Sequence, residues 1–321
     1  MVKKILKICL KVLGAILLVD LVAVVIFCIY NGIQYSKEEK LLDRYPGQLV
    51  EVNGHNMNVV VEGEGTHTLV FLAPSQDTSP AFTFKPLYSE LSDEYRTVVV
   101  EKFGYGRSDI VDTPRDYQTM VDECRAALTA AGVEAPYILC PYSKSGIDTM
   151  LWVQQYPDEV EAVIGIDMAF PAHLEKMDID AEKLKQTTAY MDMARTTGLI
   201  RAFAPNSAFS PEHSAEEITL ERAMVCRKYG NKNVNYDEFV TLPDACALAD
   251  SQPLPDKPML LFLTNGVSEM DAQTWQDIAH SYADGLTQVT YTVFDCSHYD
   301  LIDKGSAQMV QEMETFIEGS V

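Results

Sequence analysis

Runs of mainly apolar residues alternate with helical patterns in this 321-residue chain, and the alternation restricts the fold more than any other feature. The apolar runs cover residues 68–73, 96–101, 137–140 and 160–166. The helical stretches between them cover residues 84–91, 115–131 and 144–156. Strands that are apolar throughout are buried on both faces, and helical connections make neighbouring strands parallel. We therefore expect an α/β fold, with a mostly parallel sheet and helices on both of its faces.

Two further patterns complete the predicted topology. Asn53-Gly54 stands between two β-rich runs, and both residues tolerate the positive φ of a tight hairpin turn. The alternation breaks over residues 170–257, which are helical by pattern and contain no clear buried strand. Because this stretch is too long for a connecting loop, we predict an inserted helical cap. Apolar runs return after it, so the core is divided between residues 36–169 and 258–321.

The N-terminal segment predicts a membrane anchor. Residues 12–30 are 19 mainly apolar residues with one charge, Asp20, and a helix of that length spans the hydrocarbon core of a bilayer. Four lysines precede this run, so the positive-inside rule places the N-terminus in the cytoplasm. We predict an uncleaved, single-pass cell-membrane anchor in residues 1–35, with the rest of the chain extracytoplasmic. A cleaved signal peptide and a buried soluble helix are the alternatives.

Charge and cysteine content narrow the range of partners. A formal charge of −22 repels nucleic acid and anionic headgroups, so we expect no nucleic-acid partner. The polar residues 31–45 are predicted to be a connector that tethers the acidic domain to the lipid bilayer. The seven cysteines have no zinc-type spacing, and no phosphate loop or dinucleotide fingerprint is present, so we expect neither metal nor cofactor. Cys226 and Cys246 are either free thiols or a disulfide.

The strongest chemical signal lies at residues 138–146, which read Ile-Leu-Cys-Pro-Tyr-Ser-Lys-Ser-Gly. An apolar strand, a tight turn and a helix follow one another here, with Ser143 at the apex of the turn. In this context a small-x-Ser-x-small pattern forms an elbow from which the serine projects at the carboxyl edge of the sheet. The N-terminus of the following helix stabilises negative charge that develops there. We therefore predict that Ser143 is a catalytic nucleophile.

Residues 47–318 resemble the α/β-hydrolase superfamily, and specifically its cap-bearing serine hydrolases. Four motifs in order carry the resemblance: the P-x-S-x-S-G elbow, EKFGYGRSD at residues 101–109, YPDEV at residues 156–160 and CSHY at residues 296–299. The resemblance implies an eight-stranded, mostly parallel sheet with the cap inserted after the sixth strand. It also implies that His298, in the loop after the last strand, is the general base for Ser143.

The acid that orients the histidine has three candidates. A minority of the family carries it after the sixth strand, where this chain has Asp167. Most members carry it after the next strand, where this chain offers Glu269 and Asp271. We favour Asp167, because it directly ends an apolar strand whereas the later loop has no aspartate in register.

The oxyanion donors and the residue beside the nucleophile depart from the usual pattern of the family. The loop after the third strand usually reads His-Gly-x-Gly, but here residues 73–76 read Ala-Pro-Ser-Gln. Since Pro74 has no N–H, the donors are predicted to be the N–H groups of Lys144 and Ser75. The Lys144 side chain is either a cation that favours anionic acyl substrates or an exposed lysine on a first helical turn.

Together these residues predict hydrolysis of an ester or amide bond in a small or acyl substrate. The reaction would use a triad of Ser143, His298 and Asp167 and an acyl-enzyme intermediate. Capped peptidases that cleave short peptides share this arrangement and are one alternative. A catalytically silent surface protein that binds a ligand through the cap is another, because a fold does not guarantee an activity.

Overall fold

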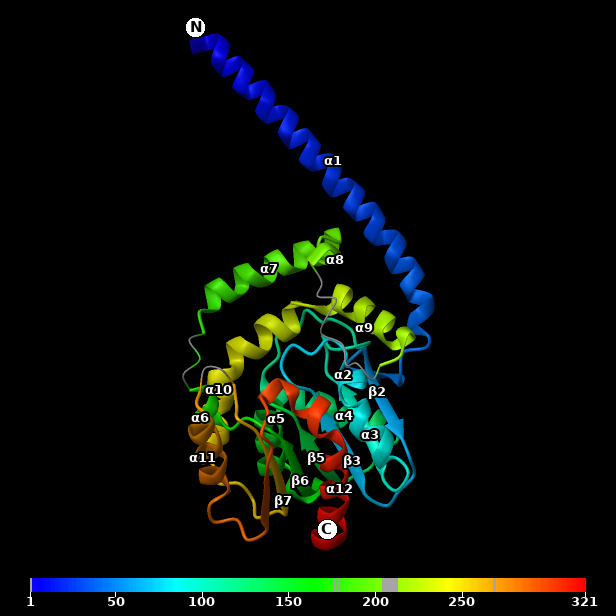
Figure 1. The fold of residues 1–321 in the computed structure, drawn as a ribbon, viewed down its shortest axis with the longest axis vertical. Coiled ribbons are helices and arrows are strands. Elements are labelled where there is room, and N and C mark those ends of the chain that lie inside the picture. The colour runs from blue at the N-terminus through cyan, green and yellow to red at the C-terminus, as the bar shows by residue number, and fades with distance from the viewer. Residues whose placement is uncertain (1, 176, 178, 204–212, 268–269) are drawn as a thin grey trace.

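The computed structural model describes residues 2–175, 177, 179–203, 213–267 and 270–321. A long N-terminal helix, α1 (Val2–Leu42), extends away from an α/β domain formed by the rest of the chain (Figure 1). The C-terminus lies at the far end of that domain. The two ends of the chain therefore lie at opposite ends of the molecule.

Eight strands form one sheet in the order β1-β2-β4-β3-β5-β6-β7-β8. The strands are β1 (Gln48–Val52), β2 (His55–Glu62), β3 (Thr68–Leu72), β4 (Arg96–Glu101), β5 (Tyr137–Pro141), β6 (Val160–Ile166), β7 (Met259–Leu263) and β8 (Val289–Val293). β2 is antiparallel to β1 and β4, and the other neighbouring pairs are parallel. The predicted mostly parallel sheet is confirmed. The Asn53-Gly54 hairpin is confirmed as well, with positive φ at both residues.

Helices cover both faces of the sheet, because its central strands present apolar side chains to both sides. One face is covered by α2 (Pro80–Thr83), α3 (Lys85–Leu91) and α12 (Leu301–Ser320). The other face is covered by α4 (Tyr117–Ala130), α5 (Ser145–Gln155) and α11 (Ala272–Ala283). Within β5, Leu139 packs on the second face, whereas Ile138 and Cys140 pack on the first. One strand therefore contributes to two cores.

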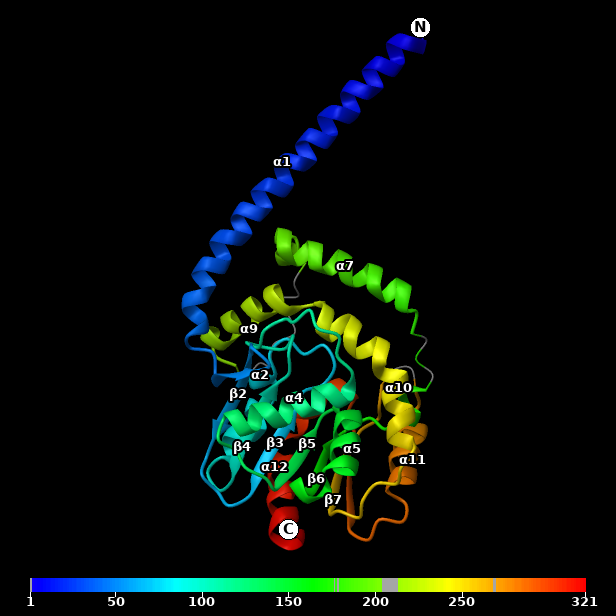
Figure 2. The same cartoon turned by 180° about the vertical axis from the view of Figure 1, so that it is seen from behind.

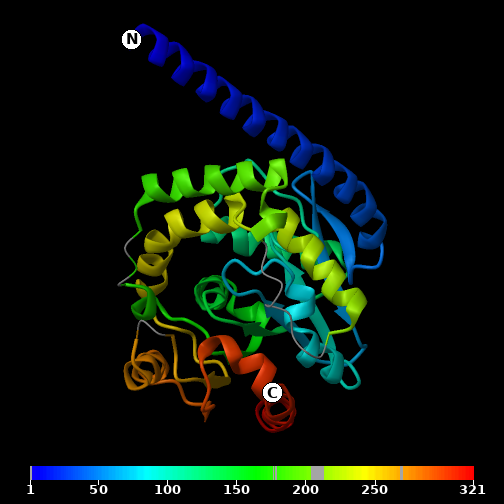
Figure 3. The same ribbon diagram turned by 45° about the horizontal axis from the view of Figure 1, so that its top comes forward.

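A run of helices separates β6 from β7 and lies over the edge of the sheet that carries Ser143 (Figures 2 and 3). We call residues 171–250 the helical insertion. It contains α6 (Pro171–Leu174), α7 (Ala181–Thr197), α8 (Ile200–Phe203), α9 (Ala215–Lys228) and α10 (Glu238–Asp250). The sequence pattern predicts helices over residues 181–197 and 215–228, and α7 and α9 have these bounds. The sequence pattern does not single out α10, because Pro243 lies inside it and a π-helical turn (Asn233–Asp237) leads into it.

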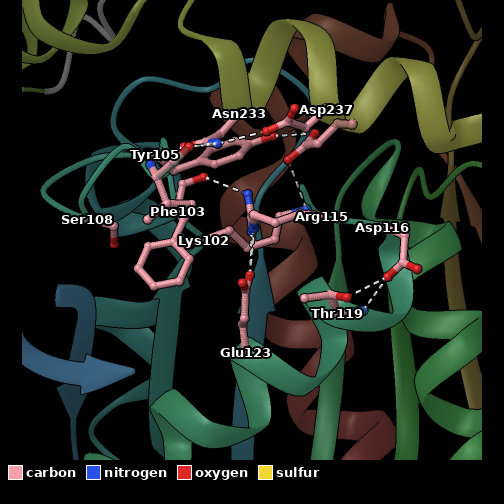
Figure 4. A network of polar contacts seen from close by, with 12 residues as sticks. Lys102, Phe103, Tyr105, Ser108, Arg115, Asp116, Thr119, Glu123, Asn233 and Asp237 are labelled. Carbon is pink, nitrogen blue, oxygen red and sulfur yellow. Dashed lines mark hydrogen bonds and ion pairs between the residues drawn. The ribbon is translucent and has the colours of Figure 1, made fainter. Parts of the chain in front are cut away.

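The loop after β4 continues the motif at residues 101–109 and is bonded to the helical insertion (Figure 4). The Asn233 side chain accepts from the N–H of Val111 and donates to its carbonyl oxygen, both at 2.8 Å. The same amide donates to Asp237 at 2.9 Å, and nearby Arg115 donates to Glu123 at 2.8 Å. Because buried backbone groups of a loop need such partners, the loop and the insertion stabilise one another.

α1 continues beyond the predicted membrane span. The helix is unbroken to Leu42, so the predicted connector at residues 31–45 is wrong over most of its length. The polar side chains that suggested a connector pack against the helical insertion, and Asn31 and Glu38 are buried there. Within the described part of the chain, α1 is the one helix whose length and composition suit a membrane span.

All seven cysteines lie in the described residues, and all of them are free thiols. Of the two states predicted for Cys226 and Cys246, the structure therefore has the reduced one. Burial raises the pKa of Cys246 to about 11 and that of Cys124 to about 12. Both thiols are therefore protonated and weakly nucleophilic at neutral pH.

The close approach of α5 to the chain after β6 generates a prediction. A Cβ atom added to Gly146 would overlap the carbonyl oxygen of Ala169. We therefore expect Gly146→Ala to lower the free energy of unfolding by about 1–3 kcal/mol, measured by thermal unfolding of the full chain in mild detergent. The control is Gly319→Ala in α12, where a Cβ meets nothing within 4 Å. Equal melting temperatures for the two variants would contradict the prediction.

Candidate active site

Ser143 stands at the apex of the turn between β5 and α5, where its backbone is left-handed, with φ of +58°. That conformation is strained for a residue with a side chain and persists only where neighbouring contacts impose it. Two such contacts flank the turn. The Ser145 hydroxyl donates to the carbonyl oxygen of Leu72, and the N–H of Ala169 donates to the carbonyl oxygen of Ser143, both at 2.8 Å. The half-buried Ser143 hydroxyl is thereby held at the wall of a cavity.

His298 lies in the loop after the last strand, at the start of a short helical turn (His298–Asp300), and is 3% exposed. Its backbone N–H donates to the carbonyl oxygen of Gly266 at 3.0 Å, which fixes the loop. Its Nε2 atom lies 2.8 Å from Ser143 Oγ, and its Nδ1 atom lies 2.6 Å from Asp167 Oδ2. The structure thus brings the three predicted residues into one row of hydrogen bonds.

Asp167 directly follows β6, has a φ of +43° and is fully buried. Its Oδ1 atom accepts from the N–H of Thr264 at 3.0 Å and from the indole N–H of Trp275 at 2.9 Å. Its Oδ2 atom accepts from the Thr264 hydroxyl at 2.5 Å and faces the imidazole of His298. A buried carboxylate is costly unless such donors surround it, and here both oxygens are satisfied.

The alternative acid Asp271 takes no part in this row of hydrogen bonds. The carboxylate of Asp271 caps α11 and accepts from the N–H and the hydroxyl three residues on, at 3.0 and 2.7 Å. Glu269 lies outside the described residues. Thr264 and Trp275, which hold Asp167, were missed by sequence reasoning. The place of Thr264 directly after β7 was a usable signal, whereas nothing local shows that an indole on α11 reaches Asp167.

A cavity of about 670 Å³ lies beside the Ser143 hydroxyl, a size that suits a small molecule. Its mainly apolar lining comes from both the core and the helical insertion, and includes Pro74, Tyr142, Ala169, Leu174, Met177, Phe239, Val267, Met270, Trp275 and Tyr299. His173 also lines it, and both of its ring nitrogens bond backbone groups, those of Phe170 and Trp275. Burial lowers the pKa of His173, so this second histidine is neutral at neutral pH.

The two predicted oxyanion donors lie at the wall of the same cavity. Within the described residues, no hydrogen bond occupies the backbone N–H of Ser75 or of Lys144. An oxyanion hole needs two free N–H groups beside the nucleophile, so both residues stay candidates for that role. The Ser75 hydroxyl is buried and has no partner among the described residues, so it is a further polar group at this wall.

The Lys144 side chain has a partner that the sequence did not reveal. It is 4% exposed, forms an ion pair with Glu238 of α10, and donates to the hydroxyl of Tyr117 at 3.0 Å. A second lysine, Lys102, lies 3.5 Å from the other oxygen of Glu238 and 3.2 Å from Asp148. Two lysines and two carboxylates thus form a buried group of zero net charge, which we call the lysine–carboxylate cluster.

The electrostatics of this cluster change the interpretation of Lys144. Burial raises the pKa of Glu238, but the ammonium groups of Lys102 and Lys144 outweigh that effect and lower it to about 2. Burial also lowers the pKa of Lys144 against the attraction of Glu238. The prediction of a solvent-exposed lysine is therefore wrong. The ammonium group is already neutralised by a carboxylate, so it is a poor receptor for an anionic substrate.

No group of three or more histidine, cysteine, aspartate or glutamate side chains is placed to hold a metal ion in the part of the chain that the structure describes. The site is instead built from a hydroxyl, an imidazole, a carboxylate and backbone N–H groups. This set of groups is suited to nucleophilic attack on a carbonyl carbon and to stabilisation of the resulting oxyanion.

Comparisons with known proteins give two relatives in sequence and a solved structure of the same fold. The uncharacterized protein YbdG of Bacillus subtilis is 35% identical over 237 residues, which are 74% of this chain and 70% of that protein. The 2-(acetamidomethylene)succinate hydrolase of Mesorhizobium japonicum is 29% identical over 139 residues, which are 43% of this chain and 48% of the enzyme. An esterase from Exiguobacterium antarcticum has the same fold, with a TM-score of 0.61 and 16% identity over 84% of this chain and 99% of its own. No protein-family model matches.

The lysine–carboxylate cluster generates a prediction on stability. Glu238→Gln would leave two buried lysines opposite one carboxylate, so we expect a loss of about 3–5 kcal/mol in the free energy of unfolding at neutral pH. Adding Lys144→Met restores neutrality and should recover most of that loss. Denaturant unfolding of the full chain in mild detergent measures both effects.

The same cluster predicts a pH dependence. The folded-state pKa of Glu238 lies below its usual value of 4.5, so its contribution is complete above that pH and is lost as the pH falls toward 2. The gap in stability between the wild type and Glu238→Gln should therefore narrow between about pH 4.5 and 2. A gap that stays constant over this window would contradict the assignment.

Proposed function

This chain belongs to the α/β-hydrolase superfamily, and from that premise we propose that it is a serine hydrolase of carboxylic esters or amides. One observation carries the proposal, namely the row of hydrogen bonds from Ser143 Oγ through both nitrogens of His298 to Asp167, at 2.8 and 2.6 Å. A serine at a strained turn, next to an imidazole and a buried carboxylate, has the geometry of an activated nucleophile.

In the proposed reaction, Ser143 Oγ attacks the carbonyl carbon of the substrate while His298 Nε2 takes the hydroxyl proton. The N–H groups of Lys144 and Ser75 bind the oxyanion, and Asp167 stabilises the imidazolium and keeps its orientation. The bond to the leaving group then breaks as His298 gives it the proton. A water molecule attacks the acyl-serine, passes its proton to His298, and releases the acid product and the free Ser143 hydroxyl.

The charges of the residues that line the cavity favour an uncharged acyl substrate. Lys144 is the one lysine or arginine among the described lining residues, and Glu238 neutralises it. Asp77 also lines the cavity and would repel an anion. We therefore propose a neutral, mainly apolar ester as the substrate, with peptidase activity on short peptides as the second outcome that a substrate panel would detect.

We also propose how the chain is organised around this reaction. Residues 1–35 would anchor the enzyme in the cell membrane, with the N-terminus in the cytoplasm and the catalytic domain outside it. Residues 36–169 and 258–321 would form the hydrolase core, and residues 170–257 its cap. The length and apolar surface of α1, and the four lysines that precede the apolar run, support this arrangement.

A fluorophosphonate probe tests the nucleophile. We expect the probe to label the wild type, because it reacts with a serine that His298 activates. Labelling should disappear in Ser143→Ala. The matched control is Ser281→Ala on α11, an exposed serine that should leave labelling unchanged. A panel of p-nitrophenyl esters and aminoacyl anilides would then separate esterase from peptidase activity. Folded wild-type protein that takes up no probe would favour the silent binding protein.

A pair of aspartate variants tests the acid. Asp167→Asn removes the charge that orients His298, so we expect kcat to fall by about 10³–10⁴-fold. Asp271→Asn keeps a good helix-capping residue at the start of α11 and should leave kcat unchanged. Steady-state hydrolysis of one p-nitrophenyl ester measures both variants. If Asp271→Asn is the more damaged enzyme, the assignment of the acid to Asp167 is wrong.

A further inference from the structure

The C-terminal part of α1 is bonded to the helical insertion. The Arg201 guanidinium binds both oxygens of Glu38, at 2.5 and 2.9 Å, and donates to the side-chain oxygen of Asn31 at 2.6 Å. The Asn31 amide donates to two carbonyl oxygens in the last turn of α7, both at 3.2 Å. Arg227 of α9 adds a hydrogen bond to the carbonyl oxygen of Tyr35 at 2.8 Å and lies over the Tyr35 ring. We call these five residues the anchor clamp.

The anchor clamp begins where the apolar run ends. Asn31 directly follows residues 12–30, and 19 helical residues rise about 28 Å, close to the thickness of the hydrocarbon core. Because α1 is continuous, a bilayer that holds residues 12–30 would place Asn31 at the boundary between the hydrocarbon and the headgroups. The last turn of α7, which is bonded directly to Asn31, must lie at the same depth.

The rest of α7 is poorly covered by protein. Thr188 is its one buried residue, while Tyr190 and Met193, three positions apart on one side of the helix, are 67% and 54% exposed. In Figures 1 and 2, α7 lies on the side of the domain that faces the free end of α1, and the C-terminus lies on the opposite side. The exposed Tyr190 and Met193 thus belong to a helix on the side of the domain nearest the bilayer that would hold α1.

The charge of α7 also differs from that of the chain as a whole. The chain carries a net charge of −22, whereas α7 has three basic and two acidic residues. Asp192 and Arg195 pair with one another at 2.6 Å, and Lys183 and Lys185 are exposed near the start of the helix. Tyrosine side chains are enriched where protein meets lipid headgroups, and exposed lysines there keep their ammonium groups in water.

We propose that the anchor clamp docks α7 on the surface of the bilayer that holds α1, with Tyr190 and Met193 in the interfacial layer. This inference rests on the proposed membrane anchor. Met177, which lines the cavity, shortly precedes α7 and is itself exposed, so docking brings this part of the cavity close to the interface. The proposed hydrolase would then take amphiphilic esters from the membrane surface.

Quenching by brominated lipids tests the docking. The full chain is reconstituted in vesicles of phosphatidylcholine and phosphatidylglycerol that carry bromine near the headgroups. One tryptophan is added as the fluorescent probe, by Met193→Trp on α7. The matched control is Glu318→Trp, an exposed position in the last turn of α12. After subtraction of the wild-type emission, we expect Met193→Trp to lose a much larger fraction of its emission than Glu318→Trp. Equal losses would overturn the proposal.

Further variants separate the possible failures. Adding Arg201→Ala breaks the anchor clamp, so quenching at Met193→Trp should fall while flotation of the protein with the vesicles is unchanged. Loss of flotation in the wild type would refute the membrane anchor itself. If quenching is as expected, Arg201→Ala should slow hydrolysis of a long-chain ester in vesicles severalfold and leave a soluble short-chain ester unaffected. A wild type that hydrolyses neither ester would refute the hydrolase and leave the docking result standing.

Discussion

Two strained turns that bond to one another support the whole candidate site. The turn after β5 carries Ser143 and the turn after β6 carries Asp167, and both residues have positive φ. The N–H of Ser143 donates to the carbonyl oxygen of Ile166 at 3.3 Å, and the N–H of Ala169 donates back to that of Ser143. Parallel strands end at the same edge of a sheet, so nucleophile and acid share one backbone frame, and His298 needs only to reach between them.

The helical insertion is held to this frame by a buried ion pair as well as by packing. Lys144 lines the cavity next to Ser143, and its ammonium group pairs with a carboxylate of α10. A displacement of α10 would leave a charge buried without a partner, which is expensive. The position of the insertion and the geometry beside Ser143 are therefore coupled, because one residue belongs to both.

Local patterns predicted much of this molecule. The strands, the Asn53-Gly54 hairpin, α7 and α9 follow from short-range periodicity, and the candidates Ser143, His298 and Asp167 were each singled out in a turn or loop that follows a predicted strand. The failures have a common cause, which is long-range contact. Nothing near Lys144 reveals Glu238, 94 positions away, and nothing in the polar residues after the apolar run reveals that Arg201 and Arg227 pair with them. Polar character suggested a connector, whereas the charges are paired inside a contact.

The continuity of α1 has a geometric consequence for the variation that the protein tolerates. A flexible tether absorbs an inserted or deleted residue without effect on the domain it carries. A continuous helix does not, because each added residue rotates the domain by about 100° and moves it by about 1.5 Å along the helix axis. The position of the anchor clamp along α1, directly after the apolar run, therefore sets the height of the domain above the membrane. One residue inserted ahead of Asn31 would move α7 about 1.5 Å farther from the bilayer, and a whole turn would move it about 5.4 Å.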